Sequence, residues 1–529
     1  MKRIAIVGSG IVGTALACRL VEAGHCVDVF ESGPDIPYPH APQYEDQVLY
    51  KSTVPPSPET DRAQPPGRPT GISQAGDYGC DIGGERVMCV GGKATRWFGI
   101  SPRFVPGSFR PKTLYGYGDD WPLTYDDLEP YYGAAERHLA VSGSSTDNPF
   151  AAPRSTGFPL PPFEPGFTDV ELARRLEAQG IVVHTTPQAR TRLAIDGRPA
   201  CENYGVCETC PTGARYSPNH HLRLAEATGR LTVHANAHVR RILMKGKRAT
   251  GLLYHQDHAA VGSEHAADVV IVAAGALESA RLLLLSEADG SHSNGIGNAS
   301  GLVGRNLTFH HVWRAHMEFA ERMMAGRAGP PTLLSHQFAN PPGRRNFGGV
   351  GVELFDNYGR SHLTEIERTR WADGKSIVAA LEAVTRCRSL TFHGESTPGP
   401  SKYMELNGAK DRYGDPSLHV HYELDEFDYE TYAFAESVGA QVAGALGANA
   451  WHIDPIKLFW SAHHHLGTCR MGETMRESVV DSFGAVHETV GLYVCGGSTF
   501  VAATPYQPTL TMVALALRTA EYVQGGLAR

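Results

Sequence analysis

Residues 3–31 contain the feature that most constrains the fold of this chain. An apolar segment, Ile4–Val7, runs directly into the glycine-rich run GSGIVG at residues 8–13. An Ala/Leu-rich stretch follows, and a second apolar segment, Val27–Phe30, ends on Glu31. This order predicts a strand, a glycine turn, a helix and a second strand, which together begin a dinucleotide-binding fold.

Each position of this motif has a physical role in binding a dinucleotide. Gly8 permits the tight turn, Gly10 lets the backbone approach a pyrophosphate, and Gly13 lets the helix pack closely on the strand. The N-terminus of the helix offers free N–H groups and a partial positive charge to the phosphates. Glu31 can accept hydrogen bonds from ribose hydroxyls and would repel a 2′-phosphate. The motif therefore favours FAD or NAD over NADP.

Length, charge and cysteine content narrow the class of protein further. The net charge of −8 argues against nucleic acid as a partner, and no apolar run reaches the ~20 residues that a membrane span needs. Because the strand–turn–helix motif that contains these glycines starts at residue 3, we expect no signal peptide. The ten cysteines are then expected to be thiols. These features predict a cytoplasmic protein that binds a small molecule.

The chain is long enough for two domains, since single cores stop growing at ~250–300 residues. Strand-like segments recur at Leu231–Val233, Val239–Leu243 and Val269–Ala273. Residues 311–454 alternate apolar and polar side chains, which is typical of an antiparallel sheet with flanking helices. The proline-rich segment 37–76 is interpreted as an inserted loop. Near the C-terminus a strand ending in paired glycines precedes a helix that starts with proline.

These segments predict an α/β fold with a discontinuous nucleotide-binding domain. Its Rossmann-like part comprises residues 1–105, 195–310 and 455–529. An antiparallel sheet with helices, residues 106–194 and 311–454, is inserted and forms the substrate-binding domain.

Six motifs together resemble the glucose–methanol–choline (GMC) family of FAD-dependent oxidoreductases. They occur in the family order: GSGIVG with Glu31, VGGKATRWFGISPRF, AAGALESARLLLLS, GLVGRNLTFHH, HHHLGTCRMG and PYQPTLTMVALALRTAEY. The pieces VGGKATRW and LYVCGG are most similar to the pyranose-oxidase branch and its bacterial sugar-alcohol relatives. The resemblance implies a Rossmann-like FAD-binding domain and oxidation of an alcohol.

The resemblance also implies which residues hold FAD. Gly8, Gly10, Gly13 and Glu31 would hold the ADP half, and Val239 would meet the adenine through its backbone. The loop residues Gly91, Gly92 and Thr95 would line the pyrophosphate and the flavin. The other positions border the ribityl chain or begin the last helix: Gly275, Gly497, Ser498 and Thr509. Some pyranose oxidases have a histidine that binds FAD covalently where this chain has Arg96, so we expect FAD to be non-covalent.

In the motif HHHLGTCRMG, the family spacing places the catalytic base at His464, whereas His463 and His465 are out of register. An imidazole is suited to take the hydroxyl proton at neutral pH while hydride leaves for flavin N5. Three adjacent histidines diverge and are poor ligands for one metal ion. The family partner, Asn or His before the last helix, is replaced by Gln507, whose amide can hydrogen-bond a substrate oxygen. Gln507 is equally interpreted as a helix N-cap.

Cys201, Cys207 and Cys210 form a second cluster, with a proline after the last cysteine. This spacing resembles iron–sulfur ligation, and some flavin dehydrogenases of the family hold a three-iron cluster in this way. A zinc site would need a fourth ligand, for which His220 and His221 are poor candidates. We favour a loop with free or loosely paired thiols and no resident metal.

We expect the substrate to be a sugar or sugar-derived polyol, and the electron acceptor to be oxygen or another oxidant. Acidic side chains in the middle of the chain make aminoglycoside-like polyols candidates, although such a run is equally typical of a solvated helix face: Glu423, Asp425, Glu426, Asp428 and Glu430. One alternative is a non-sugar alcohol or a sterol on the same machinery. Another is a flavoprotein in which FAD is structural and no alcohol is oxidised. An NAD-dependent dehydrogenase is disfavoured by the C-terminal helix motif.

Overall fold

The structure is a computed structural model of the 529-residue chain. It describes most of the chain, in these segments: 2–42, 44–45, 72–79, 81–83, 85–203, 207, 209–257, 259–286, 294–323, 330–354, 378–379, 382–383 and 385–527.

A five-stranded parallel sheet forms the first layer of the molecule. Its order is β17 (Leu492–Val494), β9 (Val269–Val272), β1 (Arg3–Val7), β2 (Cys26–Phe30) and β5 (Leu231–His234). All four residues of β9 and all but the first of β1 are buried, as expected for parallel strands covered on both faces. The strand–helix–strand start predicted from the glycine motif is therefore confirmed, and so is the α/β class.

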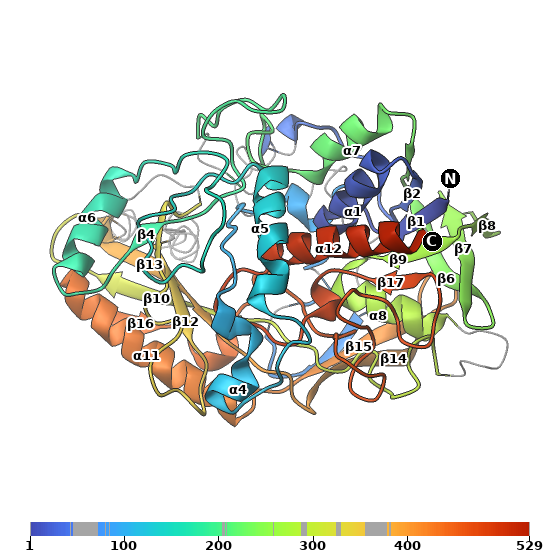
Figure 1. Ribbon diagram of the computed structural model, residues 1–529. Helices are drawn as coiled ribbons and strands as arrows, with labels where there is room; N and C mark the ends of the chain where they lie inside the picture. The colour runs from blue at the N-terminus through green and yellow to red at the C-terminus, as the bar shows by residue number, and fades with distance from the viewer. Residues whose placement is uncertain are drawn as a thin grey trace.

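Helices cover both faces of this sheet. The central helix α1 (Ile11–Glu22) packs against α12 (Thr509–Leu527) and α7 (Pro218–Glu226), while α8 (Gly275–Leu285) packs against β6 (Ala237–Lys245). Figure 1 shows α1 above the sheet and α8 below it, with the two chain termini close together. Helix α12 also contacts α5 (Tyr125–Leu139), which begins with the capping box of Thr124 and Asp127.

A six-stranded antiparallel sheet forms the second layer. Its order is β16 (Ala450–Ile453), β10 (His311–Glu318), β13 (Cys387–Gly394), β12 (Val350–Glu353), β11 (Leu333–Ser335) and β4 (His184–Thr185). The long helix α11 (Glu426–Leu446) runs along this sheet on the side away from α12 (Figure 1), and α6 (Phe167–Glu177) packs against α11. The antiparallel sheet predicted for residues 311–454 is therefore present, and it also recruits β4 from earlier in the chain.

Two three-stranded sheets complete the fold. One contains β6, β7 (Arg248–Gln256) and β8 (Ser263–Ala266), and the other contains β14 (Lys402–Lys410), β15 (Pro416–Tyr422) and β3 (Ile72–Gly76). The short elements are α4 (Pro111–Tyr115), η2 (Gly92–Thr95), η3 (Pro106–Phe109), η4 (Ile456–Leu458) and η5 (Gly497–Thr499).

Strand β3 corrects one prediction. The segment 37–76 was expected to be a loop throughout, but its last five residues, Ile72–Gly76, pair in parallel with β15. The sequence ISQAG has no strand pattern because this strand lies at the sheet edge with four of its residues exposed. Residues 43 and 46–71 of the segment lie outside the described part of the chain.

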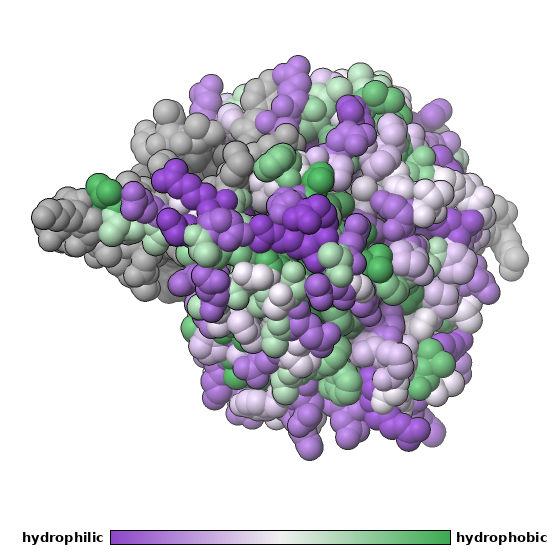
Figure 2. Space-filling view, turned by 90° about the vertical axis from the view of Figure 1, so that its left-hand side faces the viewer, coloured by the Kyte–Doolittle hydropathy of each residue, from purple (hydrophilic) through white to green (hydrophobic). Residues whose placement is uncertain are grey.

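The surface mixes polar and apolar side chains. On the face shown in Figure 2, hydrophilic side chains are interspersed with smaller hydrophobic areas. Among the described residues, the helices are all too short or too polar to cross a bilayer.

Candidate active site

A cavity of about 220 Å³ opens where β1, β2 and β9 end. Its wall includes Gly8, Gly10 and Glu31 from the first glycine motif, and Gly92 from the second glycine turn. Gly8 has a φ of 100°, and a Cβ on Gly10 would meet no atom within 4 Å. The backbone at Gly10 is therefore open to the cavity, as the close approach of a pyrophosphate requires.

Glu31 closes one end of this cavity at the end of β2. Its carboxylate accepts hydrogen bonds from Ser9 Oγ at 2.8 Å and from the backbone N–H groups of Ser9 and Gly33. Burial raises the pKa of Glu31, and these donors oppose that effect. The acid thus lies at the position where ribose hydroxyls would be expected.

The other predicted FAD residues divide into those on the cavity wall and those behind it. Gly275 and Gly497 lie on the wall, whereas Gly13 packs against the Gly8 carbonyl, from which an added Cβ would be 2.0 Å away. The remaining predicted positions lie behind the wall or on a neighbouring strand: Gly91, Thr95, Val239 and Ser498. Two of these support the loop, because Thr95 Oγ1 donates to the Gly92 carbonyl and the Gly91 N–H donates to Ser9 Oγ.

A second cavity of about 360 Å³ adjoins the first. The two share wall residues, namely Ile11, Val87, Lys93, Ala94, His463 and Met512. Thr509, predicted to bind FAD, lies on the wall of this second cavity. The shared wall makes the two cavities neighbouring parts of one site.

One face of the six-stranded sheet forms a wall of the second cavity. Strand register places Arg314, Thr391 and Glu353 in one row across β10, β13 and β12, and Val312 and His393 in the next. All five line the cavity. Sequence reasoning did not identify Glu353 or His393, since their strands lie far from the recognised motifs and only sheet register brings them together.

His464 lies on the wall of the second cavity. Its Nδ1 is 2.8 Å from Nε2 of His310, and its Nε2 has no hydrogen-bond partner among the residues described. Burial and then the neighbouring His310 hold the pKa of His464 well below its usual range. The imidazole is therefore neutral at pH 7, the state that a general base needs.

The two histidines beside His464 face other groups. His465 is buried, with Nε2 2.7 Å from Glu85, and its Nδ1 is 3.5 Å from Lys93 Nζ. His463 is exposed and its carbonyl accepts a hydrogen bond from Lys93. Burial lowers the pKa of Lys93 to about 8. His463 Nδ1 and His465 Nε2 lie 4.0 and 2.7 Å from the same Glu85 oxygen, whereas His464 Nδ1 faces His310.

Gln507 lines the same cavity as His464. Its Nε2 donates to Glu353 Oε1, and Glu353 Oε2 lies 3.2 Å from His393 Nε2. Because the carboxylate can only accept, the amide nitrogen of Gln507 must face Glu353. Its carbonyl Oε1 is buried and has no hydrogen-bond partner among the described residues.

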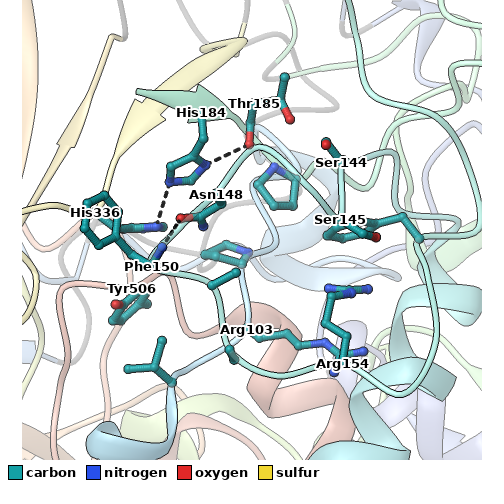
Figure 3. Close-up of a pocket in the computed structure, with 16 residues that line it drawn as sticks. Arg103, Ser144, Ser145, Asn148, Phe150, Arg154, His184, Thr185, His336 and Tyr506 are labelled. Carbon is teal, nitrogen blue, oxygen red and sulfur yellow. Dashed lines mark hydrogen bonds between the residues drawn. The ribbon is translucent and has the colours of Figure 1, made fainter. Parts of the chain in front are cut away.

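A smaller cavity of about 40 Å³ is lined in part by Tyr506, the residue before Gln507. Figure 3 shows His184 and His336 pointing toward each other at its edge, with their ring nitrogens 3.2 Å apart. The His336 ring also packs on Tyr506 at 4.4 Å between centroids. This cavity holds only a few waters, at about 10–15 Å³ each, and is too small for a sugar.

The cysteine cluster lies outside both large cavities. Cys207 and Cys210 are buried and Cys201 is partly buried. Within the described residues, one group of three potential metal ligands lies within 4.8 Å of one another, and it is Asp196, His220 and His221. Asp196 in that group is already bound by the Arg198 guanidinium.

The acidic run 423–430 begins helix α11 and does not contribute to the wall of either large cavity. Asp425 and Asp428 form its capping box, and both accept from Lys402. These two acids stabilise the helix start, so the run gives no support for a basic substrate.

The fold and the two joined cavities define a dinucleotide-binding α/β protein with a histidine at a second, substrate-sized cavity. Sequence profiles of the GMC oxidoreductase family match residues 185–312 and 398–516, and a Rossmann-like NAD(P)-binding profile matches residues 6–46. The chain belongs to the GMC oxidoreductase family and is an oxidoreductase acting on CH–OH groups.

Three relatives resemble the chain over nearly its whole length. It is 28% identical to the fructose dehydrogenase large subunit of Gluconobacter japonicus (99% of this chain, 98% of the relative). It is 29% identical to 2-methyl-1,2-propanediol dehydrogenase of Mycolicibacterium austroafricanum (98% and 94%). It is 28% identical to paromamine 6'-oxidase of Streptomyces fradiae (99% and 92%).

Among solved structures, pyridoxine 4-oxidase from Mesorbium loti has the same fold, with a TM-score of 0.65 at 18% identity over 99% of both chains.

The family implies FAD, and the first cavity fits this cofactor. The open backbone at Gly10 lies on one wall with Gly8, Gly92 and Gly275, and this glycine-lined cradle has the Glu31 carboxylate at one end. The shared wall then leads from this cradle to His464.

Proposed function

We propose that this protein oxidises a hydroxyl group of a sugar or sugar-derived polyol to a carbonyl. The observation that carries the proposal is the position of His464, a neutral imidazole on a 360 Å³ cavity that shares a wall with the dinucleotide cavity. When bound, FAD supplies the acceptor, N5, for the hydride that leaves the carbinol carbon. His464 takes the hydroxyl proton, and Gln507 orients the substrate oxygen.

The relatives support a sugar-derived substrate, since one is named a fructose dehydrogenase and another acts on paromamine. In this proposal the segments 1–105, 195–310 and 455–529 bind FAD. The segments 106–194 and 311–454 bind the substrate, through the cavity face of β10, β12 and β13.

A non-sugar alcohol is the second candidate. One relative is named 2-methyl-1,2-propanediol dehydrogenase, and the Trp97, Phe98 and Trp460 side chains give the cavity an apolar part. Small diols and sterols therefore belong in the same substrate panel as sugars, aminoglycosides and sugar alcohols.

FAD is proposed to be non-covalent, because Arg96 stands where some pyranose oxidases have the linking histidine. Precipitation with trichloroacetic acid should release all flavin into the supernatant. Iron is measured in the same preparation. We expect less than one iron per flavin, because we propose that Cys201, Cys207 and Cys210 hold no iron–sulfur cluster.

The proposal is tested by mixing the flavin-loaded protein with each substrate under nitrogen and following the 450 nm band. We expect bleaching with a sugar or polyol, and reoxidation by air or a dye then identifies the acceptor class. His464→Ala should retain FAD and slow bleaching by ~10²–10⁴-fold, the usual effect of losing a positioned general base.

His452→Ala is the matched control, because its side chain is exposed and lines neither large cavity, so it should change the bleaching rate little. If no alcohol of the panel bleaches the flavin, the protein contains structural FAD and the proposal is wrong.

A further inference from the structure

A chain of two hydrogen bonds lies behind His464. The first joins His464 Nδ1 to His310 Nε2 at 2.8 Å, and the second joins His310 Nδ1 to the backbone carbonyl of Thr504 at 3.2 Å. His310 is 1% exposed and directly precedes β10. His310 belongs to the motif GLVGRNLTFHH, whose sequence alone indicates no role for it.

The Thr504 carbonyl determines where the hydrogens of this chain lie. A carbonyl oxygen can only accept, so Nδ1 of His310 must carry a hydrogen. His310 is neutral, because burial holds its pKa well below the usual range, and its Nε2 therefore has a lone pair. That lone pair requires a hydrogen on Nδ1 of His464, which leaves Nε2 of His464 without one.

We propose that His310 is a positioning residue that holds His464 in the tautomer whose Nε2 is free to accept the substrate proton. This inference rests on the proposed function, since it assigns the atom at which His464 acts. A group that hydrogen-bonds one ring nitrogen of a histidine orients the ring and decides which nitrogen carries the hydrogen.

The proton transfer balances with this assignment. The substrate O–H bond breaks and an N–H bond forms at His464 Nε2, while the hydride carries its electron pair from the carbinol carbon to FAD. His464 then bears one positive charge, and His310 Nε2 still accepts its Nδ1–H. The neutral Nε2 of His310 stabilises that charge without itself moving a proton.

Two substitutions separate this role from packing. His310→Gln keeps an acceptor near the position of Nε2, and His310→Leu keeps the volume but removes both ring nitrogens. We expect His310→Leu to slow flavin reduction by ~10²-fold or more, as losing a tautomer-fixing partner does elsewhere. His310→Gln should stay within ~10-fold of the wild type, and FAD content should be unchanged in both.

His311→Gln is the matched control. His311 is the neighbouring buried histidine, but its partner is different. Its Nε2 lies 3.0 Å from the Tyr422 hydroxyl, and it makes no hydrogen bond to His464 among the described residues. This variant should reduce its flavin at nearly the wild-type rate. Equal losses in His310→Gln and His310→Leu would overturn the inference, because the acceptor atom would then not matter.

A spectroscopic measurement tests the tautomer without turnover. Ring ¹⁵N shifts of ¹⁵N-histidine-labelled protein, assigned by the signals lost in His464→Ala, should show Nδ1 protonated and Nε2 bare in the wild type. His310→Leu should shift the signals toward a mixture of tautomers. A wild-type His464 protonated on Nε2 would refute the inference, even if His310→Leu does not fold.

The two proposals fail differently. If His464→Ala reduces flavin as fast as the wild type, the assigned base is wrong and the proposed function loses its support. If His464→Ala is slow but His310→Leu is fast, only the role of His310 is wrong.

Discussion

Glu353 connects two side chains of the candidate active site. One carboxylate oxygen accepts from Gln507 Nε2, and the other lies 3.2 Å from His393 Nε2. The residue is 5% exposed, so losing the Gln507 donor leaves a buried carboxylate oxygen without a hydrogen-bond partner. Gln507 therefore supports the site as well as facing the cavity.

This pairing predicts different effects for two substitutions of Gln507. Gln507→Leu removes the donor to Glu353 and should lower the free energy of unfolding by about 1–3 kcal/mol, while also slowing flavin reduction. Gln507→Asn keeps an amide, one methylene shorter, and should retain substantial activity. Chemical denaturation and stopped-flow reduction at 450 nm measure the two effects. A Leu variant as stable and as fast as the wild type would contradict this role.

Some residues of the site were accessible from sequence and others were not. His464 and Gln507 belong to short motifs with fixed spacing, and the structure places both on one cavity. Glu353 and His393 are 40 residues apart and become neighbours only through the register of β12 and β13. A single sequence contains no signal for such cross-strand pairs. The alternation of apolar and polar residues shows which face of the sheet a side chain lies on, but not which residue of the neighbouring strand it contacts.

At the scale of elements, the glycine motif at the start of α1 contains two glycines with opposite surroundings, Gly10 at the N-cap and Gly13 in the first turn of the helix. Gly10 has a φ of −61° and open space where a Cβ would lie. Gly13 faces the Gly8 carbonyl, which a Cβ would approach to 2.0 Å. A side chain at Gly10 would enter the space that the ligand needs, whereas a side chain at Gly13 would clash with the protein's own backbone.

Alanine at these two positions should separate cofactor binding from folding. Gly10→Ala should fold with an unchanged melting temperature of the apoprotein but bind FAD ~10-fold more weakly or worse, since one intruding methyl group costs about 1–3 kcal/mol. Gly13→Ala should lower the melting temperature itself. Differential scanning fluorimetry and FAD titration measure both. Normal FAD affinity in Gly10→Ala would show that the pyrophosphate does not approach this turn.

Elements were predictable where the local pattern was strong. The segments β1, α1, β2 and α12 carry apolar periodicity and glycine or proline signals, and all four form as expected. Strand β3 could not be predicted because ISQAG is polar and exposed, and its partner β15 lies about 340 residues later. Long-range pairing stabilises it in place of local propensity.

At the scale of the whole molecule, neutral histidines buried in the fold make stability depend on pH. His310, His311 and His336 are at most 4% exposed, and burial holds the pKa of each well below its usual range. In the unfolded chain each takes up a proton below its ordinary pKa near 6.5. Their contribution to stability is therefore fully present above pH 6.5 and is lost as the pH falls.

The protein should consequently unfold in mild acid. Below pH 6.5 each of these histidines costs on the order of 1 kcal/mol per pH unit until its lowered folded pKa is reached, and the total stability of a protein is only about 5–15 kcal/mol. We expect a cooperative unfolding transition at about pH 5. Circular dichroism at 222 nm measures it. Burial raises the pKa of Glu85, but His465 outweighs this effect and lowers it to about 2. The stabilising effect of the ionised Glu85 is therefore lost only below about pH 4.5. Equal melting temperatures at pH 7 and pH 5 would contradict this account.

The position of β17 in the parallel sheet affects how the chain folds during synthesis. β17 pairs with β9 but emerges about 220 residues later, which is roughly 10–40 s at ribosomal speeds. Until then the apolar edge of β9 has no partner, and α1 lacks its cover by α12. Such an edge is a template for aggregation. A nascent chain stalled before Leu492 is therefore expected to need a chaperone, whereas the completed chain closes the edge with its own last strand.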